Sequence, residues 1–354
     1  MTTSPFVHET RAARVVFGRG SRDRLPAELD ALGVRRAIVL TTPEQADLGR
    51  QTAEILGERS AGLHDRAVMH VPMEAARGAI AAAREAGADA CVAVGGGSTV
   101  GLAKAIALES SLPIIAVPTT YAGSEMTPLY GITDAGVKKT GRDWRVLPRT
   151  VIYDPLLTLS LPAGLSMTSG MNAIAHAAEG LYGADASPIH RLMAEEGIRA
   201  MAAALPRLRY APADLDARDD ALYGAWLCGA VLGHVQMGLH HKLCHVLGGS
   251  FNLPHAELHT VVLPHALAYN AAAAAPAMGA IARALGATDA AAGLYELGLS
   301  LGVPRSLREI GMPADGLDRA ADLVVAAPYP NPRPLKRGPV RELLQRVFDG
   351  ALPA

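Results

Sequence analysis

Short apolar runs alternate with amphipathic stretches along the N-terminal part of the chain. The apolar runs predict buried strands, because a strand covered on both faces is apolar at successive positions. The stretches between them, among them 44–58 and 73–88, have helical patterns. This alternation predicts a parallel sheet with helices on its faces. The predicted strands cover 36–42, 89–98, 112–120 and 150–155.

The pattern changes after Pro155, where strand-like runs give way to helical periodicity and helix-forming composition. We therefore expect an α/β domain over 1–157 and an all-helical domain over 158–354. The length of 354 residues also favours two domains, because single hydrophobic cores stop growing at about 250–300 residues. The predicted helices include 166–183, 189–208, 218–249, 275–286 and 316–328.

Composition excludes several classes of protein. The 33 basic and 34 acidic residues give a net charge of −1, which offers no electrostatic footprint for nucleic acid or an anionic membrane. The three cysteines have no C-x-x-C spacing, which argues against a disulfide framework or a structural zinc site. The N-terminus lacks a signal-peptide pattern, and no apolar run is long enough to span a bilayer. We therefore expect a cytoplasmic protein.

A glycine turn follows the predicted strand 89–98, with the sequence Gly95-Gly96-Gly97-Ser98-Thr99. Glycines let a backbone approach an anion closely, and the following helix would offer free N–H groups. The turn is neither G-x-G-x-x-G nor a Walker A loop, so by itself a turn that binds nothing is equally well supported. A second loop, 118–125, follows the next strand and is also rich in Gly, Ser and Thr. Two such loops together predict a dinucleotide crevice.

Histidines are concentrated in one C-terminal segment. His241 and His245 are four residues apart in a helical context, and Asn172 and His176 repeat that spacing on another predicted helix, so each pair shares a helix face. We expect a Gly-Gly turn and a proline to bring His255 back toward that face. This predicts a functional cluster, and such paired ligands normally suggest a divalent metal. The segment contains His240, His241, His245, His255 and His259.

Longer motifs contain these features: GGGST, PTTYAGSE, SGMNAIAHAAE and LHHKLCHVLGGSFNLPHAELHTVVLPH. The chain also contains VLPRTVIYDP and ALYGAWLCGA. Together they resemble the iron-containing alcohol dehydrogenase superfamily, and within it the maleylacetate reductases, over essentially the whole chain. The resemblance implies a Rossmann-like α/β domain and an all-α domain in a dehydroquinate synthase-like fold. It also implies an active site between the domains and a homodimer.

The resemblance implies NADH as hydride donor, with NADPH also open. Relatives strict for NAD often have an acidic residue at the end of the strand 36–42, where this chain has Thr41 and Thr42. A 2′-phosphate would therefore not be repelled there. The implied cofactor contacts are Gly95, Gly96, Gly97, Ser98, Thr119, Thr120, Tyr121, Ser124, Lys139 and Thr41.

The metal-dependent members of the superfamily hold their ion with one Asp and three His. His176, His241 and His255 stand at the histidine positions of that pattern, and Asn172 stands at the Asp position. A neutral amide oxygen is a weaker ligand for a divalent ion than a carboxylate. We therefore expect no tightly bound metal, and Asn at this position resembles the maleylacetate reductases.

Reduction of maleylacetate to 3-oxoadipate, a step in aromatic-compound degradation, is the activity that the resemblance implies. Hydride adds to an alkene carbon conjugated to a ketone, and the charge spreads into an enolate, which imidazole donors can stabilise. In this hypothesis His241 and His255 are the main oxyanion donors. His245 would line the pocket, and His176 and Asn172 would orient the others or contact substrate.

Three cations are possible partners of the dianionic substrate, although ordinary surface charge explains each one slightly better: Arg142, Lys242 and Arg333. Trp144 and Pro330 depart from the pattern expected of relatives, which keeps reduction of another conjugated keto acid open. The residues are also compatible with a metal-dependent alcohol dehydrogenase, a lyase of the dehydroquinate synthase type, or a non-catalytic dinucleotide-binding protein. Asn172 argues against the first of these, and the histidine cluster argues against the last.

Overall fold

The computed structural model describes residues 6, 8, 13–134, 137–327 and 329–354 of the chain. These residues form two compact units that separate between Leu161 and Pro162. We refer to Thr10–Leu161 as the α/β unit, and to Pro162–Ala354 together with the residues up to Glu9 as the helical unit. The sequence predicts a boundary four residues earlier, after residue 157.

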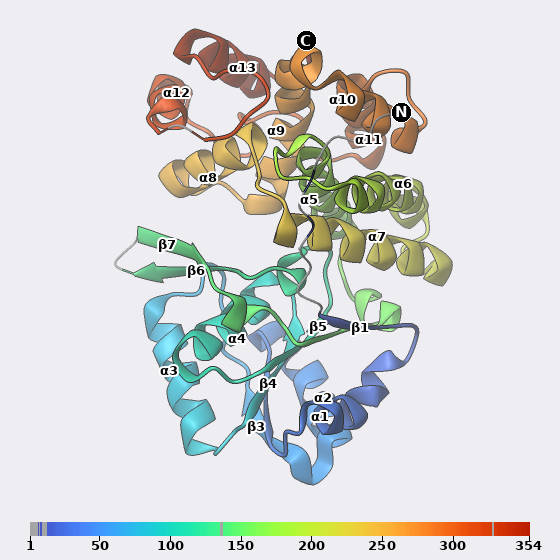
Figure 1. Ribbon diagram of the computed structural model, residues 1–354, viewed down its shortest axis with the longest axis vertical. Coiled ribbons are helices and arrows are strands. Elements are labelled where there is room, and N and C mark those ends of the chain that lie inside the picture. The colour runs from blue at the N-terminus through green and yellow to red at the C-terminus, as the bar shows by residue number, and fades with distance from the viewer. Residues whose placement is uncertain (1–5, 7, 9–12, 135–136, 328) are drawn as a thin grey trace. The chain divides into compact units, whose positions relative to one another are not determined.

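The α/β unit contains one six-stranded sheet in the order β1-β8-β5-β4-β2-β3, and every neighbouring pair of strands is parallel (Figure 1). The predicted fold class is therefore confirmed. The central strands β2, β4, β5 and β8 are buried at every position, as their apolar runs predict. The strands are β1 Arg14–Phe17, β2 Ala37–Leu40, β3 Ser60–His64, β4 Ala90–Gly95, β5 Ile114–Pro118 and β8 Thr150–Tyr153.

Two strands of this sheet and a hairpin have no counterpart among the predicted elements. β1 and β3 form the sheet edges and are partly exposed, so they lack a continuous apolar run. The antiparallel hairpin consists of β6 Leu129–Asp134 and β7 Val137–Arg142. The helices of this unit are α1 Leu25–Leu32, α2 Ala46–Leu56, α3 Met73–Glu85 and α4 Gly97–Ser110. Its 3₁₀ turns are η1 Ser21–Arg24, η2 Pro43–Gln45, η3 Gly57–Arg59, η4 Ser124–Met126, η5 Trp144–Val146 and η6 Pro155–Thr158.

The helical unit has no strand among its described residues. Helix α5 packs against α6, α7 and α9, and every residue from Ser166 to Leu181 is buried. No helix in the described ranges is long and apolar enough to cross a bilayer. The helices are α5 Ala163–Tyr182, α6 Pro188–Tyr210, α7 Leu215–His234, α8 Leu239–Phe251, α9 His255–Asn270, α10 Ala275–Leu285, α11 Ala290–Leu301, α12 Leu317–Val325 and α13 Arg337–Asp349, with 3₁₀ turns η7 Ala271–Ala274 and η8 Ala314–Gly316.

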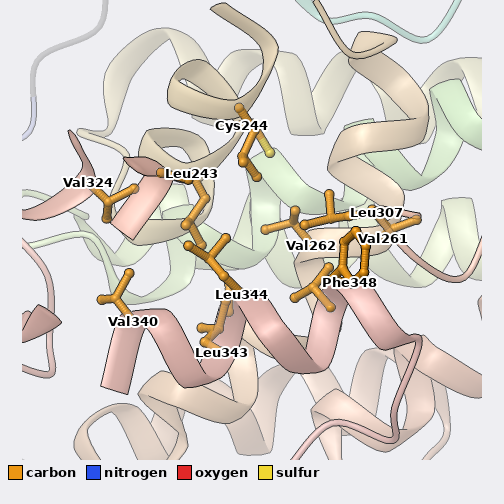
Figure 2. Packing of buried hydrophobic residues seen from close by; sticks show 14 of the residues in the cluster. Leu243, Cys244, Val261, Val262, Leu307, Val324, Val340, Leu343, Leu344 and Phe348 are labelled. Atoms are coloured by element: carbon orange, nitrogen blue, oxygen red, sulfur yellow. The ribbon is translucent and has the colours of Figure 1, made fainter. Parts of the chain in front are cut away.

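An apolar core fixes α8 and α9, the two helices that carry the histidine segment. Figure 2 shows Leu243 of α8 and Val262 of α9 in a cluster with side chains of α12 and α13. Leu243, Val262 and Leu344 of α13 are all fully buried. Burial of each such side chain stabilises the fold by roughly 1.5–3 kcal/mol, so the histidine-bearing helices are held by the core rather than by the histidines alone.

The turn before His255 differs from the prediction. Gly248 and Gly249 lie inside α8, which continues to Phe251. The helix ends where Asn252 adopts a left-handed conformation, with φ of 52°. Asn is one of the few residues other than glycine that adopts this conformation at low cost, so it can end the helix where the glycine pair does not.

Candidate active site

One face of α5 meets the start of α8 in a continuous chain of polar side chains. Asn172, His176 and Glu179 are spaced i, i+4 and i+7, which places them on one face of the helix. Nδ2 of Asn172 lies 3.2 Å from Nε2 of His176, and Nδ1 of His176 lies 2.8 Å from Nε2 of His241. Nδ1 of His241 lies 2.7 Å from a carboxylate oxygen of Glu179. All four side chains are buried.

Glu179 also accepts hydrogen bonds from the backbone at the start of α8. The N–H groups of Gly238, His240 and His241 donate to its carboxylate at 2.9, 2.8 and 3.2 Å, and the Tyr182 hydroxyl donates at 3.1 Å. Burial raises the pKa of Glu179, but the His241 hydrogen bond and the charges of the nearby imidazoles outweigh this and lower the pKa to about 2. The carboxylate therefore has two roles: it caps the start of α8 and it holds the His241 side chain.

A second buried pair lies beside this chain. Nε2 of His240 is 2.9 Å from Nδ1 of His259, and the His259 ring centroid is 5.1 Å from that of His241. Burial lowers the pKa of His240 to about 3, helped by the nearby His241, and burial lowers the pKa of His259 well below its usual range. Both imidazoles are therefore neutral at physiological pH.

The other two predicted catalytic histidines are exposed. His245 lies one turn beyond His241 on α8, with ring centroids 6.4 Å apart. His255 is the first residue of α9, and its ring centroid is 4.4 Å from that of His259. The structure thus brings His176, His241 and Asn172 into one buried chain. The catalytic roles of all five residues stay predictions.

Three nitrogen ligands that could hold a metal come from His176, His241 and His259, whose ligand atoms lie within 4.8 Å of one another. His255, the third histidine that the resemblance implies, is not in this group. Three imidazoles can hold a divalent ion, and Oδ1 of Asn172 is buried without a partner in the described part of the chain. This set is neutral, however, and two of its nitrogens are hydrogen-bonded to each other. It fits a weakly held ion better than a tightly held one.

The sequence patterns miss several residues that organise the site. Glu179 contacts His241 across 62 residues of sequence, so no local motif predicts the pair. Its position on the same face as Asn172 and His176 is the available signal. His259 belongs to the histidine-rich segment, but its pairing with His240 depends on how α8 and α9 pack.

The turn between β4 and α4 in the α/β unit requires glycine. A Cβ on Gly95, where φ is 151°, would lie 2.4 Å from Oγ1 of Thr99. A Cβ on Gly96 would lie 2.9 Å from Cγ2 of Thr120. Helix α4 begins at Gly97, which is exposed, and the N–H groups of its first two residues, Gly97 and Ser98, are the ones that can be offered to an anion, because those of Thr99 and Val100 donate to the carbonyl of Gly96. A turn of this kind has room for the pyrophosphate of a dinucleotide, and its cofactor contacts stay a prediction.

The loop after β5 is held from two sides. Nε2 of Gln45 donates to Oγ1 of Thr119 at 2.9 Å, which joins this loop to the end of β2. Nζ of the buried Lys104 donates to the carbonyl and hydroxyl oxygens of Ser124 at 2.8 and 3.2 Å. Burial lowers the pKa of Lys104 to about 7. Tyr121 is fully buried. Ser98 and Thr120 are half-buried and reach the surface.

Two predicted cofactor contacts have other surroundings in the structure. Thr41 is fully buried, with Cγ2 only 2.9 Å from the position that a Cβ on Gly49 of α2 would occupy. Its side chain faces the layer between β2 and α2, so a direct contact with a cofactor is not supported. Lys139 is exposed on β7 and pairs with Asp134 at 3.0 Å. Its ribose contact stays a prediction.

Each of the three predicted substrate cations lies over an aromatic ring. Such contacts contribute roughly 0.5–1 kcal/mol at exposed sites, so they order a side chain without removing its charge. Their part in substrate binding stays a prediction. The distances from cation to ring centroid are 5.1 Å for Arg142 and Trp144, 5.4 Å for Lys242 and Tyr329, and 4.2 Å for Arg333 and Tyr269.

A parallel sheet with a glycine-lined βα turn, joined in one chain to a helical unit with buried imidazoles, is the arrangement of a nicotinamide-dependent oxidoreductase. Residues 12–155 match the iron-containing alcohol dehydrogenase model, and residues 166–348 match the C-terminal model of the Fe-containing alcohol dehydrogenase family. The chain belongs to the iron-containing alcohol dehydrogenase family and is an oxidoreductase, as the sequence predicts.

The chain is similar to proteins named maleylacetate reductase. The one from Burkholderia cepacia is 63% identical over 99% of this chain and 99% of the relative. The crystal structure of maleylacetate reductase from Agrobacterium tumefaciens has a TM-score of 0.97 at 52% identity, covering 99% of this chain and all of that one. The enzyme from Rhizobium sp. strain MTP-10005 has a TM-score of 0.96 at 52% identity, with the same coverage.

Proposed function

We propose that this chain is a maleylacetate reductase, which reduces the conjugated carbon–carbon double bond of maleylacetate to give 3-oxoadipate. The observation that carries the proposal is the buried chain that starts at Asn172, where an amide rather than a carboxylate meets His176. The full-length identity to maleylacetate reductases supports it. A site without an anionic metal ligand suits a reaction whose negative charge is delocalised.

The bound reduced nicotinamide supplies the hydride. The protein's part is to hold the alkene carbon near that donor and to stabilise the enolate that forms as the carbon–carbon double bond becomes a single bond. Exposed His255 and His245 are placed at the start of α9 and in the middle of α8, where they can donate hydrogen bonds to the enolate oxygen. A proton from an imidazole or a water then completes the reduction at carbon.

His176, His241 and His259 would hold a divalent ion if one binds, and it would polarise the substrate carbonyl as a Lewis acid. The proposed reaction does not require this, because an enolate is less basic than the alkoxide formed in alcohol dehydrogenases. Exposed His245 and His255 can therefore act as hydrogen-bond donors without a metal.

The finer parts of the proposal concern cofactor and assembly. NADH is the proposed donor, with NADPH also accepted, since Thr41 and Thr42 put no carboxylate directly after β2. Lys139 would contact the ribose, and Arg142, Lys242 and Arg333 would hold the two substrate carboxylates. The protein would act in the cytoplasm as a homodimer. Light scattering of the purified protein tests the homodimer.

The decisive assay follows the loss of reduced-nicotinamide absorbance when maleylacetate is added to EDTA-treated protein. The proposal expects turnover at an unchanged rate after metal removal, with 3-oxoadipate as product. Absence of turnover in the metal-free protein, restored by Fe²⁺ or Zn²⁺, would instead indicate a metal-dependent reductase. Substrate conversion without net nicotinamide oxidation would indicate a lyase.

A further inference from the structure

We propose that Glu179 is a positioning residue that fixes the direction of every hydrogen bond in the chain from His241 to Asn172, and so sets the tautomers of both histidines. The catalytic consequence of this inference rests on the proposed function, whereas the assignment of the tautomers rests on the hydrogen bonds alone. Glu179 is fully buried, and its described partners are all donors: three backbone N–H groups, the Tyr182 hydroxyl and His241.

The backbone contacts determine the role of Glu179 because an N–H group can only donate. An amide or protonated acid at this position would place its own hydrogen against one of the N–H groups of Gly238, His240 or His241. The position therefore selects a carboxylate that accepts on both oxygens. His241 must then present Nδ1–H to it. At the other end of the chain, Nδ2 of Asn172 can only donate, so Nε2 of His176 is the acceptor there.

The direction of the middle hydrogen bond follows from these two ends. Nε2 of His241 accepts from Nδ1–H of His176 at 2.8 Å. Nε2 of His176 then has a lone pair, which accepts from Nδ2–H of Asn172 at 3.2 Å. Every donor in the chain thus points toward Glu179. The assignment also fixes the orientation of the Asn172 amide and leaves its Oδ1 at the far end of the chain.

The consequence for the reaction is geometric. Both histidines are held with one defined ring orientation and one defined tautomer before substrate arrives, so no reorganisation is needed during turnover. In this assignment Nδ1–H of His241 is donated to Glu179 and Nε2 accepts from His176, so His241 has no N–H left for the substrate. The first donor to the enolate oxygen is therefore a different group, and His241 acts through the order that it gives to its neighbours.

Glu179→Gln tests the proposal, because it keeps the shape and replaces one acceptor oxygen with an NH₂ donor. Whichever oxygen is replaced, the NH₂ opposes a backbone N–H at the start of α8. We therefore expect the hydrogen bond to Nδ1–H of His241 to weaken and kcat to fall about 10- to 100-fold, the usual effect of losing an orienting partner. The KM for NADH should change less than about 2-fold, because the glycine turn is untouched. Retained kcat in a folded Glu179→Gln variant would overturn the proposal.

Two measurements keep the test decisive if that variant does not fold. Imidazole ¹⁵N chemical shifts of the wild-type protein report each tautomer directly, and Nε2–H at His241 would refute the assignment without any substrate. Tyr182→Phe is the matched control, since it removes one donor to Glu179 and leaves the carboxylate. It should keep the Nδ1–H tautomer and kcat. Failure of maleylacetate turnover in the wild type would refute the proposed function while leaving the tautomer result to stand.

Discussion

The side-chain amide of Asn172 donates to His176, with 3.2 Å between Nδ2 and Nε2. An Asp at this position would be an acceptor at both oxygens, so it would oppose this bond. It would also add a negative charge beside the three nitrogens of His176, His241 and His259. One residue thus influences both the direction of the hydrogen-bond chain and the affinity of the site for a cation.

Asn172→Asp should bind Zn²⁺ more than about 10-fold more tightly than the wild type. Two unit charges 4 Å apart attract by about 4 kcal/mol at an effective dielectric constant of 20. A third of that energy, about 1.4 kcal/mol, already corresponds to a 10-fold change in affinity. Calorimetric titration with Zn²⁺ measures the change, and Asn172→Ser is the neutral control. Equal affinities for the Asp variant and the wild type would show that the three histidines do not form a cation site.

His241→Ala should reduce kcat about 10- to 100-fold, because it breaks the hydrogen-bond chain that orders His176 and Asn172. The Kd for NADH should stay within about 2-fold, because the glycine turn belongs to the α/β unit. Stopped-flow reduction and fluorescence titration separate the two quantities. His234→Ala serves as control, since its ring lies beside His190 rather than in the buried chain. Near-normal kcat in His241→Ala would exclude a role for this imidazole.

Two glycine variants separate folding from cofactor binding. Gly95→Ala should lower the free energy of unfolding by about 1–3 kcal/mol, because its φ of 151° and the nearby Thr99 leave no room for a Cβ. Gly97→Ala should fold normally, since its Cβ would meet only Ala122, at 3.9 Å. It should nevertheless raise the Kd for NADH roughly 10-fold, equal to about 1.4 kcal/mol. Unchanged NADH affinity in folded Gly97→Ala would show that the pyrophosphate binds elsewhere.

Acid should destabilise the protein through buried His265. Burial lowers its pKa to about 4, with a smaller contribution from Arg346, and its Nε2 is buried without a described partner. The unfolded chain binds the proton below about pH 6.5 and the folded chain only near pH 4, so stability falls as the pH decreases between these values.

Urea denaturation gives the size of this effect. At about pH 5 His265 should lower the free energy of unfolding by about 2 kcal/mol relative to about pH 7.5. Each pH unit below the unfolded-state pKa of about 6.5 is worth about 1.36 kcal/mol. His265→Gln should remove that part of the pH dependence. An identical loss of stability in the variant would mean that His265 is protonated in the folded protein.

Sequence patterns predict the parts of this fold that local apolar periodicity specifies. The buried strands around β4 and the glycine turn at Gly95 follow from continuous apolar residues ending in glycine. The edge strands β1 and β3 do not, because their half-exposed residues are too mixed in character. The end of α8 at Asn252 also escapes prediction, since the stronger signal of the glycine pair lies within the helix.

The candidate site divides in the same way. Spacing along α5 and α8 predicts which histidines share a helix face, and His176 and His241 do meet. Spacing does not predict that Glu179 joins them, because this contact depends on how two helices pack. Nor does it distinguish buried His241 from exposed His245, although both lie on one helix face. Tertiary packing decides which of two similar residues becomes an interior group.

The burial of α5 from Ser166 to Leu181 limits how this site can diversify. A closed helix of this kind accepts substitutions that conserve volume and little else. Asn and Asp have nearly the same shape, so position 172 can exchange an amide for a carboxylate without repacking its neighbours. A change between metal-poor and metal-holding chemistries therefore needs only one side chain at position 172, whereas exposed residues such as His245 and His255 can change without repacking the core.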